Sequence, residues 1–218
     1  AELLLFNAWN PVVVCLKQKT AYEIPCEECH IGRVQVSELV ADFTQIPPDD
    51  IVGTYEGQIL FSDRLKRLVE QEGLTGAAFR RVHHRTSRLK GERIYWQLFP
   101  TAEVLGIVKP TLVHPGEPCE ACGAVRFFLG LTKDHDDREI AKHSFYWNTG
   151  TEVFVDRNTW DGSDFALAPV FVGESPAVFV SQRFYRLVKE HNMKSASFEP
   201  IRLVEGPGEG RMEFPLLK

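Results

Sequence analysis

Two pairs of cysteines are the residues of this sequence best suited to chemistry. Cys26 and Cys29 stand in IPCEECHIGRV, and Cys119 and Cys122 stand much later in the chain, in EPCEACGAVRF. A CxxC turn aims two thiolates at one ion, and a tetrahedral zinc site takes four ligands. The two pairs therefore predict one structural Zn²⁺ site. Because sulfur fills all four positions, such a site has no place for a catalytic water.

Other roles for these cysteines remain open at the level of sequence. Each CxxC pair can act as a redox couple, although neither opens a helix as a thioredoxin-like motif does. Long-range disulfides are a further alternative, and they need an oxidising compartment. His30 stands where the second motif has Gly123, and it is an alternative ligand in a Cys3His site. Cys15, in the apolar run PVVVCLK, is predicted to be a buried apolar side chain.

The composition is that of an ordinary globular protein. The chain has 218 residues, of which 44% are hydrophobic and 25% are charged. Its longest apolar stretch falls short of the roughly 18 residues of a membrane span, so we expect no transmembrane segment. The apolar N-terminus lacks the basic region and cleavage site of a signal peptide and is predicted to be a strand. Cysteines at metal spacing suit a reducing compartment, which predicts a cytoplasmic location.

Two stretches of the sequence resemble each other, residues 61–79 and residues 180–198. When they are aligned they share Ser, Arg, Arg, Leu, Val, Ala and Phe, and their apolar positions recur with helical spacing. Ser62 and Ser181 stand at the predicted N-caps of the two helices. Each half of the chain therefore carries a capped helix, and we predict an ancient duplication.

Strands are expected to surround these helices. Gly73 and Asn192 stand where each helix should end through a left-handed residue, and an apolar segment follows each. The other strand candidates are Leu3–Phe6, Pro11–Lys17, Arg33–Leu39, Arg93–Phe99, Val104–Val108, Val125–Leu131, Glu152–Val155 and Ala168–Val172.

These elements predict an α+β fold of mostly antiparallel sheet with a few helices, in which the four-cysteine zinc site joins two similar halves. The chain is expected to form a single domain, residues 1–218. The halves are predicted to be residues 1–112 and 113–218, which meet in the loop VHPGEP.

The sequence lacks the common catalytic motifs, so we predict that the protein is not an enzyme. GxGxxG, the P-loop, HExxH and GxSxG are all missing from it. The run Asp134, His135, Asp136 and Asp137, with His143 beyond it, is compatible with a metal-dependent hydrolase. Charged runs of this kind are more often solvated loops, and that is the interpretation favoured here.

A basic cluster lies between Arg80 and Lys90. A zinc-ribbon-like nucleic-acid-binding protein is therefore an alternative function, since such proteins use basic patches. The formal net charge of the whole chain is −5, however, which disfavours a nucleic-acid partner. The cluster is accordingly predicted to be a solvated loop.

The cysteine turns PCEECH and PCEACG and the C-terminal stretch VFVSQRFYRLVKEHNMKSASFEPIRLVE resemble the double-CXXCG motif family of myxobacteria. The resemblance does not extend to residues 85–112 or 133–170. His30 departs from it, because the family has glycine there. Members of this family are described as immunity proteins of swarming-inhibition toxin systems. The resemblance therefore implies a non-catalytic protein that binds and neutralises a cognate bacterial toxin.

An acidic inhibitor is steered electrostatically towards a basic toxin such as a nuclease. Aromatic residues in polar loops are good anchors for a protein partner, although tryptophans in such loops can instead close the edge of a core. The predicted partner-binding residues are Trp147, Trp160, Asp136, Asp137 and Asp161.

Overall fold

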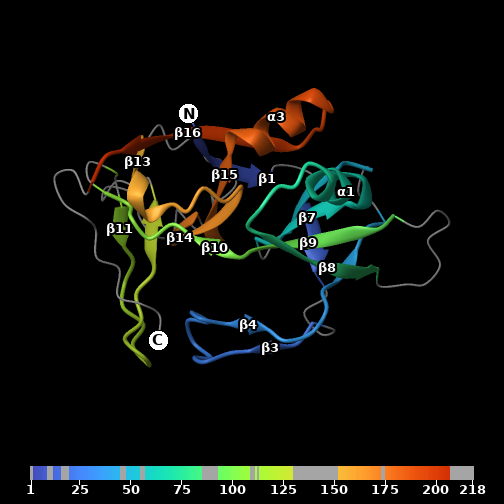
Figure 1. Cartoon of the computed structure of the whole chain (residues 1–218). Helices are drawn as coiled ribbons and strands as arrows, with labels where there is room; N and C mark the ends of the chain where they lie inside the picture. Colours follow the sequence, from blue (N-terminus) through green and yellow to red (C-terminus); the bar gives the residue numbers. More distant parts are fainter. Residues whose placement is uncertain are drawn as a thin grey trace.

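β-Sheet dominates the structure, and two α-helices pack against it in the described part of the chain (Figure 1). They are α1 (Asp63–Gln71) and α3 (Gln182–Glu190). The computed structural model describes residues 2–8, 12–15, 20–44, 48–54, 57–84, 93–108, 111, 113–129, 152–172 and 175–206. The predicted α+β class with mostly antiparallel pairing is confirmed.

The strands are short and numerous. In chain order they are β1 (Leu3–Ala8), β2 (Val12–Cys15), β3 (Tyr22–Glu23), β4 (Val34–Gln35), β5 (Val40–Asp42), β6 (Ile51–Thr54), β7 (Ile59–Ser62), β8 (Ala77–His84), β9 (Tyr95–Pro100), β10 (Ala102–Glu103), β11 (Val113–Pro115), β12 (Phe127–Leu129), β13 (Val153–Asp156), β14 (Phe165–Val172), β15 (Ser175–Ser181) and β16 (Ala196–Val204). A 3-10 helix, η1 (Arg157–Thr159), follows β13.

Two of the predicted strands were wrong in extent. The segment Arg33–Leu39 forms only β4, because its partner β3 is two residues long and cannot support a longer ladder. The segment Val104–Val108 is not a regular strand. The chain pairs with β14 through β10 and then contacts β13 through an isolated bridge between Ile107 and Val155. It therefore makes no continuous ladder over this segment.

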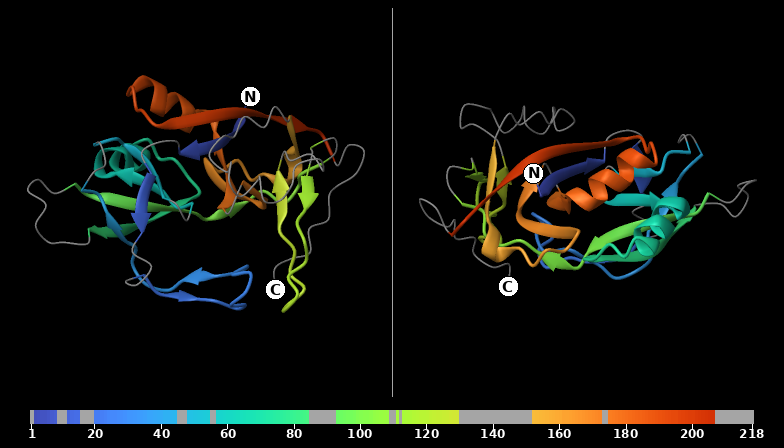
Figure 2. Two further views of the ribbon diagram at one scale, coloured as in Figure 1. Left: turned by 180° about the vertical axis from the view of Figure 1, so that it is seen from behind. Right: turned by 45° about the horizontal axis from the view of Figure 1, so that its top comes forward.

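The strands form two curled sheets and a small ribbon. One sheet is a closed barrel in the order β2-β5-β8-β9-β7-β6, and the second has the order β11-β12-β14-β15-β1-β16-β13, with β10 also paired to β14. β3 and β4 form the two-stranded ribbon. The barrel and the second sheet lie on opposite sides of the molecule (Figure 2). Neither helix has the length and apolar character needed to cross a membrane, within the residues described.

The two sheets have the same order of strands around their helices. β9 lies between β7 and β8 and is antiparallel to both, as β1 is to β15 and β16. Even the register agrees, because Tyr95 pairs with Ser62 and Leu3 pairs with Ser181, each opposite a helix N-cap. The origin of the halves by duplication and the boundary between residues 112 and 113 stay predictions.

The helices begin and end where the sequence predicts. The Ser62 hydroxyl accepts a hydrogen bond from the Leu65 N–H at 3.1 Å, and the Ser181 hydroxyl accepts one from the Arg183 N–H at 3.1 Å. At the C-terminal ends, φ is +61° at Gly73. Asn192, the equivalent residue after α3, has φ of +50°, which asparagine tolerates better than most residues.

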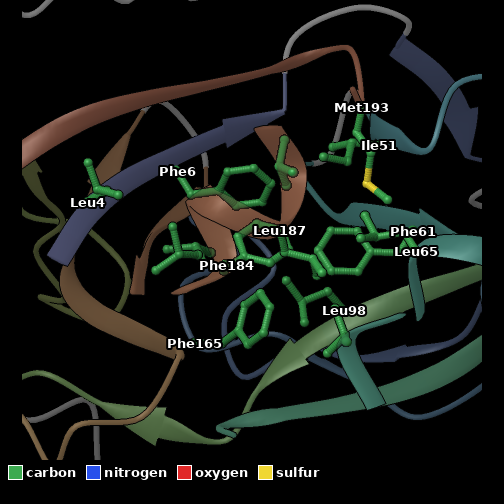
Figure 3. Close-up of a cluster of buried hydrophobic side chains, with 14 residues drawn as sticks. Leu4, Phe6, Ile51, Phe61, Leu65, Leu98, Phe165, Phe184, Leu187 and Met193 are labelled. Carbon is green, nitrogen blue, oxygen red and sulfur yellow. The ribbon is translucent and has the colours of Figure 1, made fainter. Parts of the chain in front are cut away.

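One aromatic core joins the two sheets and both helices (Figure 3). Phe184 of α3 lies at its centre, with its ring centroid 5.4 Å from that of Phe6, 5.6 Å from that of Phe61 and 4.7 Å from that of Phe165. These three rings come from β1, β7 and β14, so both sheets contribute to this core. Two further cores fill the interior of the barrel and of the second sheet.

One arginine in each helix donates a hydrogen bond to the C-terminal end of the other helix. Nη2 of Arg64 in α1 donates to the carbonyl oxygen of His191, the C-cap of α3, at 3.1 Å. Nη2 of Arg183 in α3 donates to the carbonyl oxygen of Glu72, the C-cap of α1, at 2.9 Å. Both bonds satisfy carbonyl groups that a helix end leaves without an intrahelical donor.

A carboxylate orients each of these arginines. Asp50 accepts from Nη1 of Arg64 at 3.1 Å, and Asp164 accepts from Nη1 of Arg183 at 3.0 Å. Each carboxylate also accepts from the hydroxyl of the N-cap serine of the same helix. The two sites differ in burial, because the side chain of Asp50 is 16% exposed and that of Asp164 is 1% exposed.

We expect Asp164→Ala to lower the free energy of unfolding by about 2–3 kcal/mol, because it leaves a buried hydroxyl and the Thr75 N–H without their acceptor. Asp50→Ala is the matched variant at the more exposed site, and we expect it to cost about 1 kcal/mol. Urea denaturation of both variants measures the difference. Equal losses would show that burial of the carboxylate is unimportant.

Gly76→Ala should be more destabilising than Gly73→Ala. Gly76 has φ of +79°, and a Cβ there would lie 2.3 Å from the carbonyl oxygen of Phe165. Gly73 has φ of +61°, but a Cβ there meets nothing within 4 Å. We expect a loss of about 1 kcal/mol at Gly73 and about 3 kcal/mol at Gly76, from thermal unfolding. Similar losses at both positions would contradict the steric argument.

Candidate metal centre

Two hairpin arms meet at the cysteines. The first arm, residues 20–39, runs through β3, the first CxxC turn and β4. The second arm, residues 113–129, runs through β11, the second CxxC turn and β12. Figure 1 shows the blue first arm and the yellow-green second arm extending to the same side of the molecule.

The four predicted cysteines form one cluster. The Sγ atoms of Cys26 and Cys119 are 3.8 Å apart, those of Cys29 and Cys122 are 3.7 Å apart, and all four lie within 4.8 Å of one another. A tetrahedral ion with metal–sulfur bonds of 2.3 Å requires sulfur atoms about 3.8 Å apart. The cluster is therefore able to hold a metal ion. His30, the alternative ligand, is not part of it.

The two CxxC turns have the same backbone form. The His30 N–H donates to the carbonyl oxygen of Cys26 at 2.9 Å, and the Gly123 N–H donates to that of Cys119 at 2.7 Å. Gly123 has φ of +72°, and His30 has φ of +54°. Histidine is among the non-glycine residues that tolerate this region better than most, so the missing glycine does not change the turn.

The thiols differ in acidity. Backbone hydrogen bonds from Cys29 and Glu28 lower the pKa of Cys26 to about 7. A backbone hydrogen bond from Ala124 favours the Cys122 thiolate, but burial and hydrogen bonds with the other three thiols raise the pKa of Cys122 to about 12. Without a cation the Cys122 thiol therefore keeps its proton at neutral pH. A bound divalent cation offsets the repulsion between thiolates and favours four thiolates.

A threonine holds the base of each arm. Thr20 accepts a hydrogen bond from the Val40 N–H at 3.2 Å, and Thr111 accepts one from the Phe154 N–H at 2.7 Å. Both threonines are buried. Sequence analysis missed them. Their only signal is the same residue type shortly before each CxxC motif.

The arms also contact each other outside the cluster. Nη2 of Arg126, in the second arm, donates to the carbonyl oxygen of Cys29 in the first arm at 2.7 Å. This bond ties the two CxxC turns together through protein atoms alone. The arms therefore have a contact that does not require the metal.

Of the predicted partner-binding residues, only Trp160 and Asp161 lie within the described structure. Trp160 is half-buried against the core of the second sheet, and its Nε1 donates to the carbonyl oxygen of Ser163 at 2.9 Å. Asp161 is exposed, and hydrogen bonds from the Ser163 hydroxyl and N–H lower its pKa. Trp147, Asp136 and Asp137 lie outside the described residues. Partner binding by this set stays a prediction.

The alternative sites are described only in part. His135 and His143 lie outside the described residues, as does the basic stretch 85–92. Arg80 and Arg81 are exposed on β8, and Arg80 donates to the carbonyl oxygen of Gln35 in the first arm.

Replacing Cys29 and Cys122 together with serine should abolish metal binding, because two of four thiolate ligands are removed. The unaltered chain should carry one metal ion, measured as the metal-to-protein ratio by plasma mass spectrometry. Cys15→Ser is the matched control and should keep the full metal content. A double variant that still binds one ion per chain would contradict the four-cysteine site.

No protein-family model matches this chain, and a search of curated proteins finds no match either. The resemblance to the double-CXXCG family therefore stays a hypothesis that rests on the residues themselves.

Proposed function

We propose that this chain is an immunity protein that binds and neutralises a cognate bacterial toxin without catalysis. The observation that carries the proposal is the meeting of both CxxC turns in one cluster at the ends of two arms. These turns are the feature that resembles the double-CXXCG family. An immunity protein needs a rigid scaffold and a complementary surface, and it needs no reacting groups.

The metal in this proposal is zinc, in a structural role. Four cysteine thiolates at tetrahedral spacing are a typical structural zinc set, although iron also accepts sulfur ligands in this geometry. A fully occupied set of sulfur ligands leaves no open position for water or substrate. Zinc would then fix the position of each arm against the other. A reducing cytoplasm, where thiols persist, is the compartment that suits such a site.

We further propose that the chain consists of two similar halves that arose by duplication. Three features support this. The order β6-β7-β9-β8-β5 matches the order β14-β15-β1-β16-β13. The arginine contacts between the helices are reciprocal, and a threonine holds each arm in the same way. A division between β8 and β9, in which each half contributes its first strand to the sheet of the other, is an alternative to the predicted boundary at residue 112.

A rescue assay tests the proposed function. The reading frame adjacent to this gene is expressed in a bacterial host, with and without this chain. We expect the neighbour alone to stop growth and this chain to restore it by at least about tenfold in viable count, because a tight complex removes free toxin by mass action.

In the control, the gene for this chain is replaced by the gene for an unrelated acidic protein of similar size, which should not restore growth. A neighbour that is harmless, or that kills whether or not this chain is present, would remove the immunity function.

A further inference from the structure

Exposed apolar side chains gather on the first arm. Val34, in β4, is 56% exposed, and Val36, which directly follows β4, is 51% exposed. Leu105, at 47%, is the remaining large apolar side chain with this degree of exposure among the described residues. Two exposed valines on the same face of one small ribbon indicate a binding surface more specifically than scattered apolar residues do.

The two valines face away from the barrel. Gln35, which stands between them, directs its side chain inward, and its Nε2 lies 3.0 Å from Oε1 of Gln97 in β9. Tyr22 pairs with Gln35 across the ribbon, and its hydroxyl accepts from Gln58 at 3.3 Å. Because side chains alternate along a strand, Val34 and Val36 lie on the opposite, outer face of the ribbon.

The second arm shows what normally covers such residues. Counted from the cysteines, Val34 and Val36 correspond to Phe127 and Leu129 of β12. Leu129 is fully buried in the core of the second sheet, and Phe127 packs against that core. Among the described strands, β12 pairs with β14, whereas β4 pairs only with β3. In the first arm the equivalent apolar positions are left open to a partner.

The two arms carry an excess of acidic residues, and Glu23 pairs with Val34 across the ribbon. The described residues of the two arms contain two arginines and six glutamates, all six of them exposed: Glu23, Glu27, Glu28, Glu38, Glu117 and Glu120. The arginines are engaged within the protein, because Arg33 lies over the Tyr22 ring and Arg126 donates to Cys29. Four thiolates around a divalent ion would add further negative charge.

We propose that the outer face of the first arm, centred on Val34 and Val36, is the surface that docks the toxin. Its occupant is a basic protein that places apolar side chains on the two valines and lysine or arginine side chains on the surrounding glutamates. This proposal rests on the proposed immunity function. Attraction by the glutamates speeds association, and burial of the valines slows dissociation.

The first arm is suited to this role because it is held at several points. Thr20 fixes its base, the Gln35–Gln97 contact fixes its middle, and the cysteine cluster fixes its tip against the second arm. A surface ordered in advance loses little conformational entropy on binding. A metal ion in the cysteine cluster would therefore support recognition by holding the arm in position.

The test uses the full chain with Val34→Ser and Val36→Ser together, and the purified product of the adjacent reading frame as the probe. We expect the double variant to weaken binding at least about tenfold and to fail in the rescue assay. Leu105→Ser is the matched control, since it removes a similarly exposed side chain elsewhere, and it should bind like the unaltered chain. Full metal content in each variant shows that the arms remain assembled.

A second variant tests the charge. Glu27→Lys with Glu28→Lys should slow association at low salt, and the difference from the unaltered chain should shrink as salt rises, because added ions screen exposed charges. Association rates measured by surface plasmon resonance at several salt concentrations give this comparison. An unchanged rate at low salt would overturn the basic character of the partner surface.

The outcomes separate this surface from the function itself. If the unaltered chain neither rescues growth nor binds the probe, both proposals fail. If it does both and the valine variant does so equally well, the immunity function stands and the docking surface is wrong. The docking surface is also wrong if Asp161→Lys is the variant that loses binding, because Asp161 lies outside the first arm. A chain that dimerises alone and becomes monomeric in the valine variant would identify a second copy as the occupant instead.

Discussion

The packing of both helices and both sheets into the buried core around Phe184 is the constraint on which the arrangement of this protein depends, because apolar burial outweighs exposed polar contacts. The reciprocal bonds of Arg64 and Arg183 add to it at the surface. Each guanidinium reaches the last carbonyl groups of the other helix, where the helix dipole concentrates partial negative charge. A carboxylate next to each helix start keeps the arginine in place. The apolar faces of both helices then meet in the core around Phe184, and the two sheets are held in one orientation.

The position of the metal centre follows from that orientation. Its two cysteine pairs are 93 residues apart in the chain, and each lies at the end of an arm. Closing so long a loop costs conformational entropy when the ends are free. Here the sheets already bring the arms to the same side, and Thr20 and Thr111 fix their bases. A metal ion thus has only the last turns of each arm left to order.

Local signals allowed part of this structure to be predicted from sequence. Ser62 and Ser181 mark helix starts, and two CxxC turns indicate a shared ion, because each signal acts within a few residues. The placement of β1 at the centre of a distant sheet has no such signal, since alternation reveals a strand and not its partners. Arg64 and Arg183 occupy matching positions in the two similar stretches. Their role was hidden because the acceptors are backbone carbonyls, which every residue type possesses.

The difference between the arms connects structure to recognition. In the second arm an apolar face pairs with its own sheet and disappears into a core, whereas in the first arm the same positions stay exposed. Exposure of this kind lowers solubility and brings no benefit to folding, so its presence on a firmly held ribbon favours a binding role. A rigid arm is useful only if something keeps its tip in place. The cysteine cluster does that from the side of the second arm, which leaves the outer face of the first arm free for a partner.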